Sequence, residues 1–142
     1  MRMTIFPFMI CFALVTSALC QSTNEAGPTT AQASQQEKKQ QLRTALEQMR
    51  DAIDRYHGLF IRGKIMAKAG SQGYPSDLEE LVKTTYVDAH GQAIHLLHGI
   101  PVDPMTGTMD WGLRRRSPPG FIFDVYTKSD GTALDGTKYK DW

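Results

Sequence analysis

The residues best suited to chemistry lie near the end of the chain, where carboxylates alternate with glycines and hydroxyl side chains. Asp130 and Asp135 each precede a glycine, and Thr127 and Ser129 lie just before the first of them. Calcium in proteins is bound by about six to eight oxygens, chiefly carboxylates and carbonyls, on a chain that bends sharply. Thr127, Ser129, Asp130 and Asp135 are therefore candidate ligands of a structural Ca2+ ion.

The same residue types are also common in turns that bind nothing. The spacing lacks the alternating acids and the closing Glu of a helix-loop-helix calcium site. On the residues alone, the plain turn is the favoured interpretation and the Ca2+ site is the alternative.

Two histidines form the other candidate metal pair. His95 and His98 would lie one turn apart on a helix, a spacing that permits joint ligation of a metal. No cysteine of the mature domain and no Glu-containing zinc motif accompanies them. Surface or partly packed histidines are the favoured interpretation.

A catalytic centre is not expected. The chain has no nucleophile elbow, no phosphate-binding glycine loop and no Cys/His pair outside residues 1–20. Asp103 and Asp110 are possible paired acids, but Asp-Pro and Asp-Trp in loops are more common as structure. A net charge of +1 also argues against nucleic acid as the main partner, because phosphate binding needs a concentrated positive field.

Residues 1–20 have the pattern of a secretory signal peptide. Arg2 precedes an apolar run from Ile5 to Val15, which ends in small residues. The run is shorter than the roughly 20 residues that span a bilayer. Both cysteines, Cys11 and Cys20, lie in this segment, so the mature domain is expected to contain no disulfide. The protein is expected outside the cytoplasm, periplasmic or secreted; the alternatives are a retained leader as a short inner-membrane anchor, or lipidation at Cys20.

The 142 residues are enough for one folded domain. Residues 21–36 are polar and low in complexity, which predicts a disordered tether, and the domain occupies residues 37–142. A helix is expected from about Glu37 to Ala69, with Gly70 as its C-terminal cap. Its apolar stripe recurs at steps of three and four and comprises Leu42, Leu46, Met49, Ile53, Tyr56 and Phe60.

A short second helix and two strands follow. The helix is expected over Asp77–Lys83, with Ser76 as N-cap and Glu79 completing a capping box. The strands are expected over Trp111–Arg115 and Phe121–Tyr126, the second with the two-residue alternation of a sheet. Ser117-Pro118-Pro119-Gly120 is expected to join them as a hairpin loop. The run Arg114-Arg115-Arg116 at the end of the first strand is expected to be part of a solvated hairpin; contact with acidic lipid or an acidic partner is the alternative. The fold class is α+β, a long N-terminal helix packed on a small antiparallel sheet with an acidic C-terminal loop.

Over roughly residues 42–142 the chain resembles the pseudopilins, above all the major pseudopilin of type II secretion systems. The matching pieces are LRTALEQMRDAIDRYH, GYPSDLEELV, VDPMTGTMDW and FDVYTKSDGTALDGTKYKDW. Their combination is fairly specific, although no single piece would be. The resemblance implies a pilin-like head in which residues 42–69 form one continuous helix across a small antiparallel sheet.

The resemblance also implies calcium. In this family the loop after the last strands binds Ca2+, which steadies the subunit and aids assembly. By position, Asp130 matches the acid of the Asp-Gly motif and Asp135 the next acidic position. Ser129 and Thr127 match less closely because the loop is shorter here. With the resemblance included, the Ca2+ site becomes the favoured interpretation.

The beginning of the sequence departs from the family. The short basic leader, the peptidase site after a glycine and the apolar helix that anchors pseudopilins and packs the filament core have no counterpart. We therefore expect a non-enzymatic, extracytoplasmic protein that acts by contacts with other proteins of a type II secretion or pilus-like assembly, and that reaches a membrane only through an uncleaved leader or a lipidated Cys20. The alternative is a free-standing exported binding domain with no role in secretion.

Overall fold

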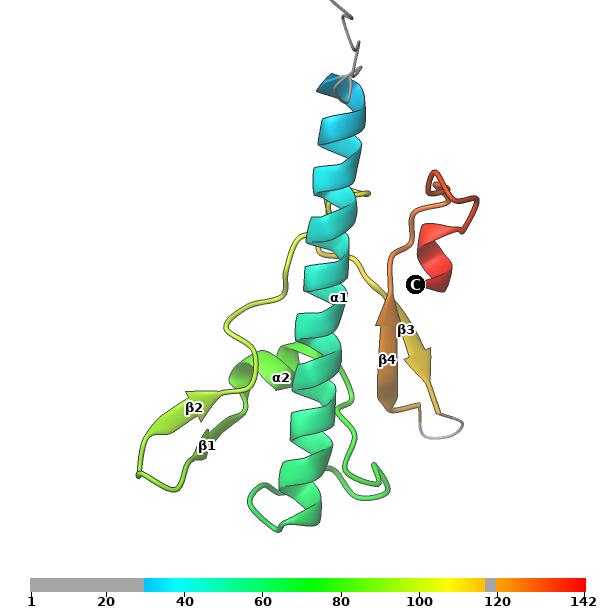
Figure 1. Cartoon of the computed structure of the whole chain (residues 1–142). Helices are drawn as coiled ribbons and strands as arrows, with labels where there is room; N and C mark the ends of the chain where they lie inside the picture. The colour runs from blue at the N-terminus through cyan, green and yellow to red at the C-terminus, as the bar shows by residue number, and fades with distance from the viewer. Residues whose placement is uncertain (1–29, 117–119) are drawn as a thin grey trace, which may run out of the picture.

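The structure is a computed structural model that describes residues 30–116 and 120–142, in which one long helix is flanked by a short helix and two antiparallel hairpins (Figure 1). The elements are α1 (Thr30–Ile61), α2 (Leu78–Lys83), β1 (Thr85–Val87), β2 (Ala93–His95), β3 (Gly112–Arg115), β4 (Ile122–Tyr126) and the 3-10 helix η1 (Tyr139–Asp141). This arrangement confirms the α+β class and the long first helix. The expected signal peptide and residues 21–29 of the expected tether lie outside the described residues.

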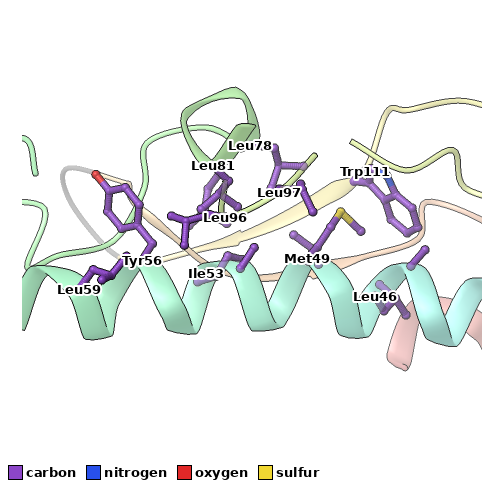
Figure 2. Packing of buried hydrophobic residues seen from close by; sticks show 14 of the residues in the cluster. Leu46, Met49, Ile53, Tyr56, Leu59, Leu78, Leu81, Leu96, Leu97 and Trp111 are labelled. Atoms are coloured by element: carbon purple, nitrogen blue, oxygen red, sulfur yellow. The ribbon is translucent and has the colours of Figure 1, made fainter. Parts of the chain in front are cut away.

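The apolar stripe of α1 forms one side of the core. Its buried members are Leu42, Ala45, Leu46, Met49, Ala52, Ile53, Tyr56 and Leu59. They face Leu78 and Leu81 of α2 together with Leu96, Leu97 and Trp111 (Figure 2). The prediction of Phe60 as the last member is wrong: Leu59 is 4% exposed and Phe60 is 38% exposed. The helix continues its periodicity by a step of three from Tyr56, which selects Leu59.

Both predicted ends of this helix are wrong. It begins at Thr30 rather than near Glu37, so residues 30–36 of the expected tether are helical. That stretch contains two alanines and three glutamines, which are good helix formers, and it continues directly into the packed part of α1. Within the described residues, no helix is long and apolar enough to cross a membrane.

The C-terminal end of α1 is set by Gly63 and not by Gly70. Gly63 has a φ of 65°, a left-handed conformation that glycine adopts without steric cost. Its N–H donates to the carbonyl of Phe60 at 2.9 Å, and the N–H of Lys64 donates to Leu59 at 2.9 Å. These two bonds are those of a Schellman cap. Residues 42–61 are therefore one continuous helix, whereas residues 62–69 are not, contrary to the resemblance.

The cap of α2 lies one residue later than expected. Asp77, not Ser76, is the N-cap, and its carboxylate accepts the N–H of Glu80 at 2.8 Å. The Glu80 carboxylate in turn accepts the N–H of Ser76 at 2.8 Å. As in a capping box, side chains at the start of the helix accept free backbone N–H groups in both directions, but Glu80 has the role predicted for Glu79.

The strands form two separate two-stranded sheets rather than one. Strands β3 and β4 lie where they were expected and pack on α1 through β4, while β1 and β2 form a second hairpin on the other side of it (Figure 1). The register on β4 passes from Asp124 to Ile122 and skips Phe123, which is a β-bulge. As a result Ile122 and Val125 are both fully buried, and the strict alternation predicted for this strand is wrong.

Candidate metal centre in the C-terminal loop

The C-terminal loop begins at Thr127, where β4 ends and the chain is still in the core. Thr127 is 0% exposed, and its hydroxyl donates a hydrogen bond to the carboxylate of Asp103. Asp103 is also 0% exposed and accepts the N–H of Met105 at 2.8 Å. The Thr127 hydroxyl thus links the start of the C-terminal loop to the turn at Asp103. Only the main-chain carbonyl of Thr127 would remain to bind a cation.

Ser129 and Asp130 continue the loop toward solvent. The N–H of Ser129 donates to the Thr127 hydroxyl at 3.1 Å, and the Ser129 hydroxyl accepts the N–H of Gly131 at 3.2 Å. The Asp130 side chain is 94% exposed, and its carboxylate lies 3.6 Å from Nζ of Lys140. Hydroxyl-capped turns therefore present Asp130 to water.

Asp135 occupies a second turn of the same loop. Its carboxylate accepts the N–H of Thr137 at 3.0 Å and the Thr137 hydroxyl at 2.6 Å. It also lies 4.0 Å from Nζ of Lys39 on α1. The Thr137 hydrogen bonds, assisted by the Lys39 charge, lower the pKa of Asp135. This acid is therefore anionic at neutral pH, as a calcium ligand must be.

The donor set suits a hard cation in chemistry, because every candidate ligand offers oxygen. The structure does not gather the four residues into one shell: Asp130 contacts Lys140, Asp135 contacts Thr137, and the Thr127 hydroxyl is used internally. Among residues 30–116 and 120–142, no cluster of three or more His, Cys, Asp or Glu side chains could hold a metal ion. A Ca2+ ion here would have to displace Lys140 and draw on main-chain carbonyls.

A network around Asp124, which the sequence did not predict, fixes this loop to the helix. Nε of Arg50 on α1 donates to one Asp124 oxygen at 2.7 Å, and Arg114 on β3 donates to the other at 2.7 Å. The Arg50 guanidinium also donates to the main-chain oxygens of Val125 at 3.1 Å and Trp142 at 2.6 Å. One arginine thus joins α1, β4 and the residue farthest along the loop.

The charge state of Asp124 follows from these contacts. Burial alone would raise the pKa of this carboxyl, but the hydrogen bond from Arg50, the N–H of Val125 and the two guanidinium charges outweigh burial and lower it. An acid in the middle of a strand that packs on a helix needs such a partner. The sequence shows the acid at Asp124, but it does not identify Arg50, which lies off the predicted apolar stripe of the helix.

Trp142 closes the loop against α1. Its indole N–H donates to the Thr137 hydroxyl at 3.0 Å, and its ring meets that of Tyr139 edge-on, with centroids 5.0 Å apart. The Arg43 guanidinium lies 4.6 Å from the indole centroid and Nζ of Lys39 lies 5.3 Å from it. These cation–π contacts stabilise the position of the ring.

The other acids and the arginine run have structural contacts. Asp103 and Asp110 are not a pair, because Asp103 is bonded to Thr127 while Asp110 meets Lys128 at 2.6 Å. The arginines also bind their own domain: Arg115 donates to the carbonyls of Ser76 and Gly120, and Arg116 lies over the rings of Tyr74 and Phe123. Arg115 and Arg116 are exposed, as expected for a solvated hairpin, and their guanidinium groups also contact the domain.

Comparisons with known proteins add no relative to this description, so a functional proposal depends on the sequence and on this geometry. No family model, no curated protein and no solved structure matches the chain. The pseudopilin resemblance consequently depends on the quoted sequence pieces and on the order of elements.

Proposed function

We propose that this protein is a non-enzymatic, pseudopilin-like protein that acts outside the cytoplasm through contacts with other proteins of a type II secretion or pilus-like assembly. The observation that carries the proposal is the order of elements around α1. A long helix is followed by a short helix after Gly73-Tyr74-Pro75, an antiparallel hairpin that packs on the long helix, and an acidic loop that returns to it. This is the layout that the resemblance implies, apart from the earlier end of α1 and the division of the strands into two separate sheets.

The surface available for such contacts supports the same proposal. Residues 30–41 of α1 are exposed except for the half-buried Lys39, so this end of the helix extends beyond the core (Figure 1). Leu134 of the C-terminal loop is 79% exposed beside it. Together they line a groove formed by Gln32, Ala33, Gln36, Glu37, Gln40 and Leu134. A single exposed leucine is ordinary on a protein surface, so the support comes from its position in a groove beside the projecting end of α1.

Site-specific photo-crosslinking tests this contact. A photoreactive residue at Gln36 should capture a component of a secretion or pilus-like assembly in intact cells, and the same residue at exposed Glu79 on α2 serves as the control. Capture of the same components from both positions, or of none from Gln36, would remove the assembly role. The alternative, an exported binding domain, is supported if Gln36 captures only a peptide or a cell-wall component.

Calcium is proposed as the structural ligand of the C-terminal loop, with Asp130 and Asp135 as carboxylate ligands and Thr127 and Ser129 contributing oxygens. An ion that binds the folded state alone, at a hundred times its dissociation constant, would stabilise it by about 2.7 kcal/mol. The melting temperature should therefore be higher in CaCl2 than in EGTA. Asp130→Asn should abolish that difference, whereas Asp54→Asn on the exposed face of α1 should keep it. Identical wild-type melting curves in calcium and chelator would exclude the site.

A further inference from the structure

A second pair of potential ligands lies away from the C-terminal loop, beside hairpin β1–β2. His95 is the last residue of β2 and His98 lies in the bend that follows. Between them Leu96 and Leu97 are buried, at 6% and 7% exposed, while both histidines are exposed. Because the two leucines turn into the core, the bend returns His98 to the side of His95. Their ring centroids are 6.2 Å apart, with the planes tilted by 51°.

This separation is close to that of two imidazoles on one metal. Ring nitrogens bind Zn2+ at about 2.0–2.1 Å, which places the centroids of two ligating rings about 5 Å apart in a tetrahedral site. Both side chains are at the surface, so small rotations bring them to this distance without disturbing the core. The pair therefore needs little reorganisation to bind a metal.

Thr85 orients one of the two rings. It is the register partner of His95 in the β1–β2 hairpin, and its hydroxyl oxygen lies 3.2 Å from Nδ1 of His95. When Nδ1 donates its hydrogen to this oxygen, the lone pair lies on Nε2, which faces away from the strand partner. A hydrogen bond of this kind to the second ring nitrogen fixes the tautomer and raises the basicity of a histidine ligand.

The pair opens onto a groove of about 370 Å³ between α1 and residues 94–99. The charged side chains along it are Asp51 and Arg55 of α1, which lie 4.0 Å apart and offset each other. The groove therefore has space for the waters that complete a coordination shell. The Arg55 charge is offset by Asp51, so these two residues together do not repel a metal cation. In Figure 1 the hairpin lies to the left of α1 and the C-terminal loop to the right, so this is not the calcium candidate.

We propose that His95 and His98 form a two-imidazole site for a borderline divalent transition metal such as Cu2+ or Zn2+, with water in the remaining positions. Imidazole nitrogen favours these ions over Ca2+, which selects oxygen, and Cu2+ binds such sites most tightly of the divalent series. His95 ends β2 and His98 lies in the bend that follows, so a bound ion would hold the end of this strand and the bend together.

The site is tested in the full chain with Cys11→Ser and Cys20→Ser, which remove thiolates as competing ligands. Substoichiometric paramagnetic Cu2+ is added to the 15N-labelled protein in excess CaCl2. The amide signals of residues 94–99 should lose intensity first. Zn2+ titration calorimetry should then show at least tenfold weaker binding for His95→Ala and for His98→Ala, and unchanged binding for His90→Ala, an exposed histidine in the preceding turn.

The proposal is overturned if the Cu2+ effect is centred on His57, His90 or the C-terminal loop, or if either alanine variant loses less than tenfold in Zn2+ affinity. The substituted rings are exposed, so both variants should keep the wild-type amide spectrum outside residues 84–99. A global change in that spectrum would instead assign the histidines a structural role and would equally overturn the proposal.

Discussion

Arg50 on α1 and Asp124 on β4 are joined by an ion pair in which Nε lies 2.7 Å from a carboxylate oxygen. The two side chains are 34% and 19% exposed, so the pair is largely removed from water. Because the same guanidinium also donates to the main-chain oxygen of Trp142 at 2.6 Å, the pair fixes both the hairpin and the loop to the helix. The predictions below begin from this contact.

Replacing Arg50 by methionine should lower the free energy of unfolding by about 2–3 kcal/mol, because Asp124 would keep its burial and lose one of its two cationic partners. Urea denaturation of wild type and variant measures the difference. The control is Arg55→Met, whose pair with Asp51 is exposed and 4.0 Å long, and which should change stability by less than about 0.5 kcal/mol. Equal effects of the two substitutions would contradict the structural role of Arg50.

Stability should fall in acid through Asp124 and Glu80. The pKa of Asp124 is lowered by Arg50 and Arg114 against the effect of burial, and that of Glu80 is lowered by Tyr56 and Ser76 against burial. A group with a lowered folded-state pKa contributes stability above its unfolded value, about 3.9 for Asp, and loses it as the pH falls through the folded value. Urea unfolding between pH 7 and pH 2.5 should show this loss below about pH 4.

Two substitutions separate the contribution of Asp124 from the general effect of acid. Asp124→Asn should be less stable than wild type at pH 7 and should lose less stability between pH 5 and pH 2.5, since the titrating group is gone. Asp54→Asn, on an exposed face of α1, should follow the wild-type curve. A wild-type slope in Asp124→Asn would show that this carboxylate does not couple to folding.

The two glycines near the end of α1 should respond to alanine with opposite signs. Gly63 has a φ of 65°, so Gly63→Ala should destabilise the protein by about 1 kcal/mol. Gly58 is within the helix, and an added Cβ there would first meet the flexible Arg62 side chain at 3.5 Å. Gly58→Ala should therefore stabilise the protein by about 0.5–1 kcal/mol. Thermal unfolding of both variants measures the effects, and a shift of the same sign in both would place the helix end elsewhere.

The buried Tyr56 hydroxyl should contribute to the stability of the fold. Tyr56 is 1% exposed, and its hydroxyl donates to the Glu80 carboxylate at 2.6 Å, which links α1 to the cap of α2. Burial and the Glu80 contact raise the pKa of this phenol, so it remains a donor at any pH of physiological interest. Tyr56→Phe should cost about 1–2 kcal/mol in urea unfolding. Tyr86→Phe, at a half-buried position on β1, is the control and should cost less.

The parts of the fold that the sequence predicted well are those governed by periodicity. Five of the six expected stripe residues, Leu42 to Tyr56, are buried, because a step of three or four places them on one face whatever else the chain does. The strands β3 and β4 also lie where they were expected, although the strict alternation predicted for β4 does not hold. The bulge at Phe123 was not foreseen, because it depends on how Arg115 pairs across the hairpin rather than on the strand's own pattern.

Helix ends and long-range partners were predicted less well. Gly63 lies inside the helix predicted from about Glu37 to Ala69, and its function as a cap depends on two backbone bonds that the residue type does not reveal. Arg50 was not identified as a long-range partner, because Asp124 is 74 positions away along the chain. In the C-terminal loop the residue types of Asp130 and Asp135 indicated oxygen ligation, but the lysines beside them come from η1 and α1 and were not predictable from spacing.

The distance along the chain between α1 and β4 has a consequence for biosynthesis. The stripe of α1 emerges from the ribosome long before Ile122 and Val125, with which its packing is completed, and the Arg50–Asp124 link spans 74 residues. At about 5–20 residues per second, the apolar side of the helix waits on the order of 4–15 s for its cover. We expect the nascent chain to be most prone to aggregation during that interval, until β4 covers the apolar side of the helix.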